Sequence, residues 1–293
     1  IGLVGSEMCI RDRIIGVIKM KINFGSKFDK QCSDMIEVCL KAMSKVMEYY
    51  KNGFDVEIKS DNSPVTDADK QSDLIIKSFL KEKYPTYAFL TEESNDDKAR
   101  LNEKYVFIID PLDGTKDFVA KDDMFAINIA LVEEHTPVVG VVGIPAQNKI
   151  YFAIKDYGSY LLENDALKRI YASDRTDNLI MSCSVFHSGK TDQEIFDKFQ
   201  NRILKKHPLG SALKSCLIAE GKVDCCFSSS GNTKEWDTCA PQIIVEESGG
   251  HFTTFYGDQI TYNREDVYNR NGYAAYNAST ENNLSVQLIE SKK

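Results

Sequence analysis

The sequence lacks any long apolar run. Its longest nearly unbroken apolar stretch, Val138–Ala146, contains glycines and a proline and is far shorter than the roughly 20 residues that a membrane-spanning helix needs. The first 20 residues have short apolar pieces interrupted by Glu7, Arg11, Asp12 and Arg13, which is not the layout of a secretory signal peptide. We therefore expect neither a membrane span nor secretion, and a cytoplasmic location.

The chain also lacks an initiator Met at position 1, and residues 5–13 resemble translated cloning or sequencing-adapter sequence. We expect Met20 to be the native start. Residues 1–19 are accordingly expected to be a non-native or disordered leader.

No basic run is present, and 36 Lys and Arg residues against 44 Asp and Glu residues give a net charge of −8. An acidic chain has no general attraction for nucleic acid or anionic lipid, so neither a nucleic-acid polymer nor a membrane is an expected partner. The length of 293 residues and the 42% apolar content are typical of a globular protein with one large domain or two lobes.

The eight cysteines include no C-x-x-C pair, which excludes a zinc ribbon and a thioredoxin-type redox motif. Several lie inside apolar segments, where reduced thiols pack as small hydrophobic groups. This usage agrees with a cytoplasmic protein.

Apolar spacing predicts an α+β chain with an α/β second half. Helices are predicted over 29–50 and from Thr66, as N-cap, to about Lys83, followed by strands 87–91 and 105–109 and an antiparallel meander of strands 125–132, 137–144, 149–155 and 158–162. Then come strand 179–184, helices 191–205 and 211–221, strand 222–227, helix 236–248, strands 251–254 and 272–276, and a helix from 280. We expect an N-terminal α+β lobe of residues 20–165 and a C-terminal α/β lobe of residues 166–293, divided within the polar stretch 163–177.

Acidic residues follow several of these elements. Asp110-Pro111-Leu112-Asp113-Gly114-Thr115 has two carboxylates around a turn, a pattern that alone is more typical of an ordinary turn. Asp69, Glu92 and Asp237 also lie at element ends. Such a set of oxygen ligands suits Mg²⁺, whereas zinc is disfavoured because no His or Cys accompanies them.

The residue spacing excludes three motifs of other phosphate-handling enzymes. The two acids of the turn are one residue too far apart for the D-x-D-x-T motif of phosphatases that form an aspartyl-phosphate. Gly189-Lys190-Thr191 lacks the earlier glycine of a P-loop, since Ser184 stands there. No cysteine precedes an arginine at C-x₅-R spacing, which excludes a thiol phosphatase.

Two segments carry a family resemblance. Ile109–Phe118 (IDPLDGTKDF) and Trp236–Gly250 (WDTCAPQIIVEESGG) resemble the diagnostic segments of the lithium-sensitive, magnesium-dependent inositol monophosphatase superfamily. Lys59–Lys70 and Gly210–Cys216 are most similar to its 3′(2′),5′-bisphosphate nucleotidase branch. The similarity covers about residues 30 to 290 and implies a layered αβαβα sandwich, as in inositol monophosphatase and fructose-1,6-bisphosphatase.

The resemblance implies a set of site residues. Two or three Mg²⁺ ions would be bound by Glu92, Asp110, the Leu112 carbonyl, Asp113 and Asp237, while Thr115 and Asp69, with Glu92, would orient and deprotonate the attacking water. Thr91, Cys239 and Pro241 depart from the usual pattern without affecting a ligand.

Substrate contacts are also implied. The amides of Gly114 and Thr115 would cradle the phosphate, Lys214 would meet the non-reacting 5′-phosphate, and His187, Gly210, Ser211 and Asp237 would contact the substrate. An isolated lysine or histidine is, however, more often a partly exposed surface residue, and a lone Trp236 beside an apolar helix is ordinarily core.

The implied activity is removal of the 3′-phosphate of 3′-phosphoadenosine 5′-phosphate, giving AMP and phosphate, a reaction of sulfur metabolism. Inositol monophosphatase is the alternative enzyme, and a non-catalytic nucleotide- or metal-binding regulator is the alternative of another class. The protein is expected to be a monomer or homodimer.

Overall fold

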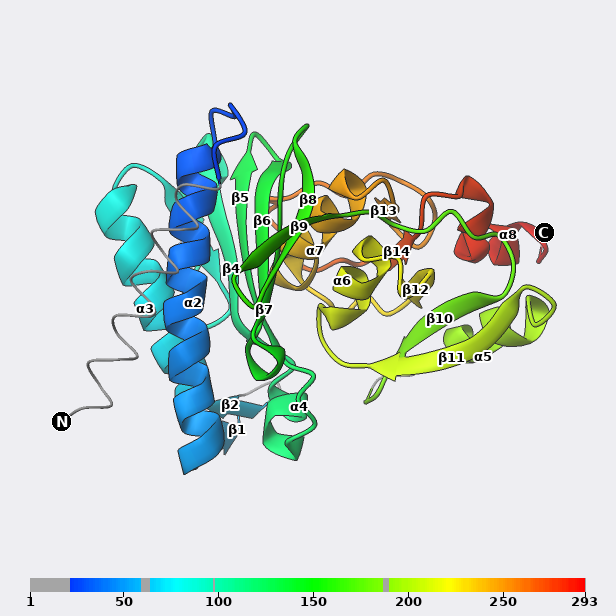
Figure 1. The fold of residues 1–293 in the computed structure, drawn as a ribbon, viewed down its shortest axis with the longest axis horizontal. Coiled ribbons are helices and arrows are strands. Elements are labelled where there is room, and N and C mark those ends of the chain that lie inside the picture. The colour runs from blue at the N-terminus through cyan, green and yellow to red at the C-terminus, as the bar shows by residue number, and fades with distance from the viewer. Residues whose placement is uncertain (1–21, 59–63, 97, 187–189, 293) are drawn as a thin grey trace.

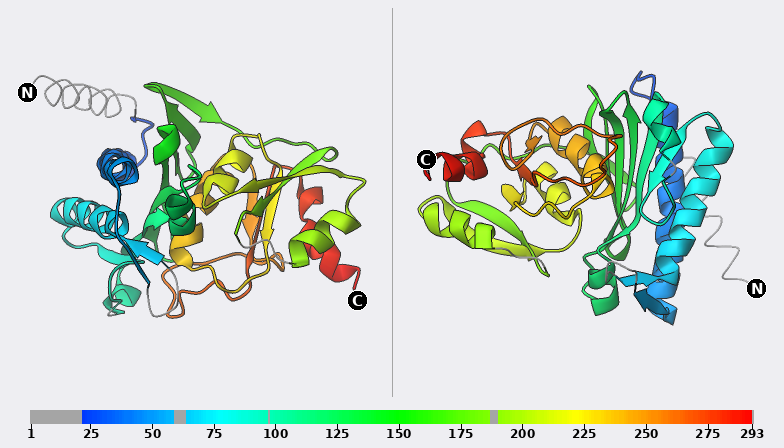
Figure 2. Two further views of the ribbon diagram at one scale, coloured as in Figure 1. Left: turned by 90° about the horizontal axis from the view of Figure 1, so that it is seen from below. Right: turned by 180° about the vertical axis from the view of Figure 1, so that it is seen from behind.

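The computed structural model describes residues 22–58, 64–96, 98–186 and 190–292. Five layers lie side by side in Figure 1 and in the right-hand view of Figure 2. Helices α2 (Asp29–Asn52) and α3 (Asp67–Lys83) cover a seven-stranded sheet. Helices α6 (Leu213–Ala219) and α7 (Glu235–Glu247) separate it from a five-stranded sheet, whose outer face is covered by α5 (Lys190–Lys198) and α8 (Leu284–Glu290). This is the expected αβαβα order.

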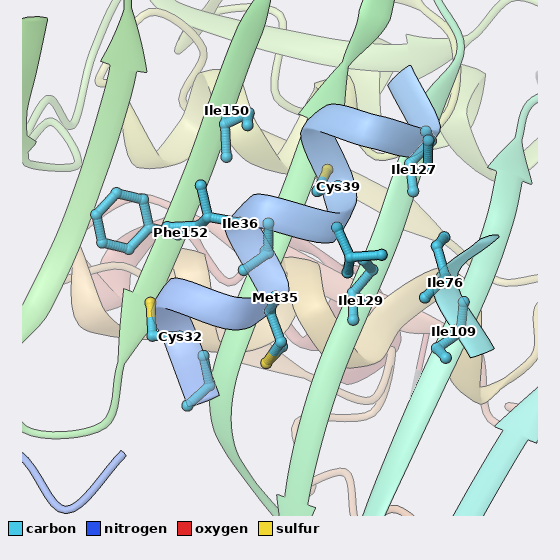
Figure 3. Close-up of a cluster of buried hydrophobic side chains, with 14 of the residues drawn as sticks. Cys32, Met35, Ile36, Cys39, Ile76, Ile109, Ile127, Ile129, Ile150 and Phe152 are labelled. Atoms are coloured by element: carbon cyan, nitrogen blue, oxygen red, sulfur yellow. The ribbon is translucent and has the colours of Figure 1, made fainter. Parts of the chain in front are cut away.

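The outer helices form because their apolar residues recur at helical spacing. Figure 3 shows Met35, Ile36 and Cys39 of α2 against Ile129 and Phe152 of the sheet. The sequence correctly predicted both helices. Thr66 caps α3, since its hydroxyl accepts a hydrogen bond from Ala68 N.

The seven-stranded sheet has the order β3-β4-β5-β6-β7-β8-β9, with only the β3–β4 pair parallel. Its strands are β3 (Ala88–Thr91), β4 (Tyr105–Asp113), β5 (Ala126–Glu133), β6 (Thr136–Ile144), β7 (Lys149–Ile154), β8 (Gly158–Glu163) and β9 (Ala166–Ile170). Helix α7 packs closely on this sheet at Gly140, where a side chain would not fit. A Cβ there would lie only 2.5 Å from Ile243 Cγ2 and 2.7 Å from the Ala240 carbonyl oxygen.

Strand β9 was not predicted, and it extends the first sheet to Ile170, beyond residue 165. Four of its five residues are exposed or half-buried, so it has no run of buried residues to mark it in the sequence. The lobe division at 165/166 stays a prediction, and the second sheet begins at Leu179.

The five-stranded sheet has the order β11-β10-β12-β14-β13. Its strands are β10 (Leu179–Ser184), β11 (Ile203–Leu209), β12 (Cys225–Ser228), β13 (His251–Thr253) and β14 (Tyr273–Tyr276). Strand β10 is parallel to β11 and β12, and the pairs β12–β14 and β13–β14 are antiparallel.

The predicted helix over 191–205 is wrong in its second half. Helix α5 ends at Lys198, and β11 begins at Ile203 as the edge strand beside β10. An edge strand tolerates Pro208, which has no N–H to donate. The buried side chains of Ile203 and Leu209 bind this strand to the core.

Short elements complete the fold. They are the pair β1 (Val56–Ile58) and β2 (Pro64–Thr66), helix α4 (Thr115–Ala120), and the 3₁₀ turns η1 (Ala99–Asn102), η2 (Pro145–Gln147) and η3 (Thr280–Asn282). Among the described helices, none combines the length and apolar character needed to cross a membrane.

Candidate active site

Four of the five predicted site acids, Glu92, Asp110, Asp113 and Asp237, line one cleft of about 420 Å³, whereas Asp69 does not line it. Glu92 follows β3, Asp110 and Asp113 flank a register shift in β4, and Asp237 lies in the first turn of α7. The predicted site residues that line the cleft are Glu92, Asp110, Leu112, Asp113, Gly114, Thr115, Ser211, Lys214 and Asp237. The first sheet, helix α4 and the helices between the two sheets thus contribute to a single site.

The centre of the cleft is a carboxylate cluster, formed by Asp110, Asp113 and Asp237. One oxygen of each lies within 4.8 Å of the others. Burial, followed by the negative charges of Glu92, Asp113 and Asp237, raises the pKa of Asp110 well above its usual range. Burial and then the charges of Asp113 and Glu92 raise the pKa of Asp237 to about 8.

Hydrogen bonds fix the orientation of each carboxylate in the cluster. Asp110 Oδ1 accepts from Leu112 N at 3.0 Å, and Asp237 Oδ2 accepts from Lys234 N at 2.6 Å. Asp113 Oδ2 accepts from Asn128 Nδ2 at 3.1 Å and from Ala212 N at 2.7 Å. The cluster is therefore held together by backbone and amide donors although its members repel one another.

The cluster fits a divalent cation. Its three donor atoms are all carboxylate oxygens, which magnesium and calcium prefer and which differ from the nitrogen and sulfur ligands typical of zinc. A cation would also offset the repulsion that raises the pKa values of these acids. Mutually repelling, partly buried carboxylates in a fixed arrangement are expected of a metal site rather than of a solvated surface.

Thr115 and Asp69 form a hydrogen-bonded pair at the edge of the cluster. The Thr115 hydroxyl donates to Asp69 Oδ1 at 3.0 Å and lies 3.3 Å from the Leu112 carbonyl oxygen. Asp69 Oδ2 accepts from Thr66 N at 2.8 Å and from the Thr66 hydroxyl at 2.6 Å. Burial raises the pKa of Asp69, and the bonds from Thr66 oppose this. The capping box of α3 therefore also orients Thr115.

The remaining predicted residues lie in different places. Lys214 lines the cleft and donates to the Ser211 carbonyl at 2.8 Å. Gly210 does not line the cleft, and it lies against the Asp117 carboxylate instead. His187 lies outside the described residues. Trp236 is buried in the core between the sheets.

Sequence reasoning missed several residues that line the cleft or support it; Asn128 does not line the cleft but donates to Asp113. Asn128 is buried in the middle of β5, where only its opposition to Asp110 in the strand register reveals a role. Asp117 follows Asp113 by four residues. Burial and then the negative charge of Asp122 raise the pKa of Asp117 to about 7. Hydroxyl and aromatic residues of the second sheet line the far wall, among them Ser182, Ser228 and Tyr273.

This fold and this cleft define the class of the protein. The sequence model of the inositol monophosphatase family matches residues 30–291, and the chain belongs to that family. Among its relatives, the 3′(2′),5′-bisphosphate nucleotidase CysQ of Haemophilus influenzae is 31% identical over 247 residues, which cover 80% of this chain and 88% of that protein.

Solved structures agree with this assignment. CysQ from Bacteroides thetaiotaomicron, a bacterial member of the inositol monophosphatase family, has a TM-score of 0.73 and 30% identity, covering 86% of this chain and 98% of its own. The extragenic suppressor protein suhB from Bartonella henselae has a TM-score of 0.74 and 25% identity, covering 87% and 96%. The fold class expected from the sequence is confirmed.

Proposed function

We propose that the protein is a Mg²⁺-dependent 3′(2′),5′-bisphosphate nucleotidase that converts 3′-phosphoadenosine 5′-phosphate to AMP and phosphate. The observation that carries the proposal is the carboxylate cluster beside the Thr115–Asp69 pair. Similarity to the CysQ nucleotidases at 30–33% identity supports the choice of substrate. Lithium is expected to inhibit the activity.

The cluster would hold the metal ions. Asp110, Asp113 and Asp237 would be ligands, together with Glu92 and the Leu112 carbonyl. Bound divalent cations neutralise phosphate oxygens and make water a better nucleophile. The cluster would thus be deprotonated in the working enzyme, because a nearby cation favours the charged form of a carboxylate.

Thr115 would move the proton of the attacking water. Its hydroxyl hydrogen is directed to Asp69 Oδ1, so its oxygen lone pairs are free to accept a hydrogen bond from water. Asp69 would take the proton that Thr115 gives up, and the two bonds from Thr66 would hold it in position. General base catalysis of this kind contributes typically 10²–10⁴-fold to a rate.

The second phosphate would lie toward Lys214. This lysine provides positive charge in a cleft that is otherwise rich in acids, and it opposes the rise in the pKa of Asp113. The amides of Gly114 and Thr115 would bind the reacting phosphate. A substrate with two phosphates then uses both sides of the cleft.

Phosphate release from 3′-phosphoadenosine 5′-phosphate and from inositol 1-phosphate, at equal concentrations with Mg²⁺, tests the proposal. We expect a higher kcat/KM for the nucleotide. The opposite order would make the protein an inositol monophosphatase, which the family description favours as the second candidate. Mg²⁺ binding without turnover of nucleotide, inositol or sugar phosphates would indicate a non-catalytic regulator.

Asp110→Asn should remove most of this activity, because it takes one negative charge from the cluster while preserving its shape. Asp34→Asn is the matched control. Asp34 is also buried, but it lies in α2 and accepts hydrogen bonds from Lys83 and the Tyr84 hydroxyl. Full activity in the Asp110 variant would contradict its proposed role. The cytoplasmic location and the monomer or homodimer stay predictions.

A further inference from the structure

Asp117 is a buried acid that the proposed chemistry does not use. It lies in α4, lines the cleft and is 5% exposed. Its Oδ1 atom is buried and has no hydrogen-bond partner among the described residues. A buried carboxylate oxygen without a donor is costly, so the position of this group requires an explanation.

Two glycines make room for the Asp117 carboxyl group. A Cβ on Gly210 would overlap Asp117 Oδ1, and a Cβ on Gly114 would lie 3.0 Å from Asp117 Oδ2. Gly114 precedes α4 in the first half of the chain, whereas Gly210 follows β11 in the second half. The carboxyl group is therefore wedged between two turns that are distant in sequence.

The turn at Gly210 and Ser211, which lies against the Asp117 carboxyl group, leads to Lys214. Ser211 has a positive φ of 45°, a conformation that is unfavourable for a residue other than glycine. Contacts with the first half hold it there: the Ser211 hydroxyl donates to the Met124 carbonyl at 2.7 Å, and Ala212 N donates to Asp113 Oδ2 at 2.7 Å. Lys214 Nζ in turn donates to the Ser211 carbonyl.

The Asp117 carboxyl group is suited to act as a spacer. Burial and then the neighbouring negative charges of Asp122 and Asp113 raise its pKa to about 7. The absence of side chains on Gly114 and Gly210 leaves the space that the carboxyl group occupies. No ion pair of Asp117 is found among the described residues.

We propose that Asp117 is a positioning residue for substrate selection. Wedged between Gly114 and Gly210, its carboxyl group sets the separation between the turn that would bind the reacting phosphate and Lys214, which would bind the second phosphate. This inference rests on the proposed function. Since the two phosphates of the substrate are joined through one ribose, their separation varies little, and a change in the wedge weakens binding of the second phosphate.

The test compares 3′-phosphoadenosine 5′-phosphate with 3′-AMP, which has the reacting phosphate but lacks the second one. In Asp117→Ala, KM for the bisphosphate should rise by about tenfold, the value of one charge-assisted hydrogen bond, while kcat changes little. KM for 3′-AMP should change far less. Asp117→Asn, which preserves the volume, should restore most of the preference for the bisphosphate.

Asp34→Ala is the control for general destabilisation, because it removes a buried aspartate outside the cleft. An unchanged ratio of kcat/KM for the two substrates in Asp117→Ala would overturn the inference. If that unchanged ratio came with an equal loss of kcat/KM for both substrates, Asp117 would only support the reacting centre.

A stability measurement distinguishes failure of the wedge from failure of the proposed function. Gly210→Ala should lower the melting temperature because the new Cβ displaces the Asp117 carboxyl group, and it would also lie 2.9 Å from the Met124 carbonyl oxygen. Adding Asp117→Ala should recover part of this loss. If the wild type hydrolyses neither nucleotide, the proposed function fails. The melting temperature of the double variant still tests whether the Asp117 carboxyl group is packed against Gly210. Additive losses of melting temperature from the two substitutions would refute that packing.

Discussion

Replacing Asp237 by Asn should make the metal-free protein more stable while abolishing its response to Mg²⁺. Burial and the charges of Asp113 and Glu92 raise the pKa of Asp237 from 3.8 to about 8. The native state then holds a proton that the unfolded state has lost, so the stability of the metal-free protein falls as pH rises from about 4 to about 8. Asn carries no charge and removes this penalty, and its side-chain oxygen still accepts the bond from Lys234 N.

The size of the effect follows from the pKa shift. At pH 7 the shift corresponds to about 4 kcal/mol, and water in the cleft reduces this to about 2 kcal/mol because Asp237 is only half-buried. For a chain of this length, about 2 kcal/mol corresponds to a rise in melting temperature of about 4 °C. Mg²⁺ at 100 times its Kd stabilises the wild type by about 2.7 kcal/mol, which reverses the order of the two proteins.

Thermal unfolding followed by circular dichroism, with EDTA or with excess Mg²⁺, measures both effects. The difference between variant and wild type in EDTA should shrink as pH falls toward about 4. Asp34→Asn serves as the control and should keep the full Mg²⁺ response. A less stable Asp237 variant in EDTA at about pH 8, or an unchanged Mg²⁺ response, would refute the reasoning.

Two further predictions concern the Thr115–Asp69 pair and the packing of α7. Thr115→Val should lower kcat by about 100-fold in steady-state kinetics with little change in KM; an unchanged kcat would remove Thr115 from the proton path. Gly140→Ala should cost about 1–3 kcal/mol in urea unfolding, because its Cβ would lie 2.5 Å from Ile243 Cγ2, and equal stability would contradict the close packing of α7 on β6.

The elements that the sequence predicted well have local signals. Helix α3 has an N-cap at Thr66 and ends at Lys83, just before Pro85, and both signals lie within the segment itself. Strand β11 has no such signal. Lys205, Lys206 and His207 continue the polar character of α5, and only pairing with β10 makes residues 203–209 a strand.

The same distinction applies to the site. Asp110, Asp113 and Asp237 were found because acids at the ends of elements stand out in a sequence, and the structure brings them together. Asn128 and Asp117 were missed because their positions depend on tertiary contacts. Asn128 is one polar residue in an apolar strand, and Asp117 is significant only beside Gly210, which is remote in the chain.

The carboxylate cluster joins residues that are far apart in the chain, and this has a consequence for folding kinetics. Asp110 belongs to the first sheet and Asp237 to a helix between the two sheets. Contacts between residues so far apart in the chain are slow to form, because closing the intervening loop costs chain entropy before the contacts can stabilise the fold. The helices α2 and α3 need only local contacts to begin. We therefore expect activity to return late in refolding, after most secondary structure is present, so that an activity assay reports a slower phase than circular dichroism.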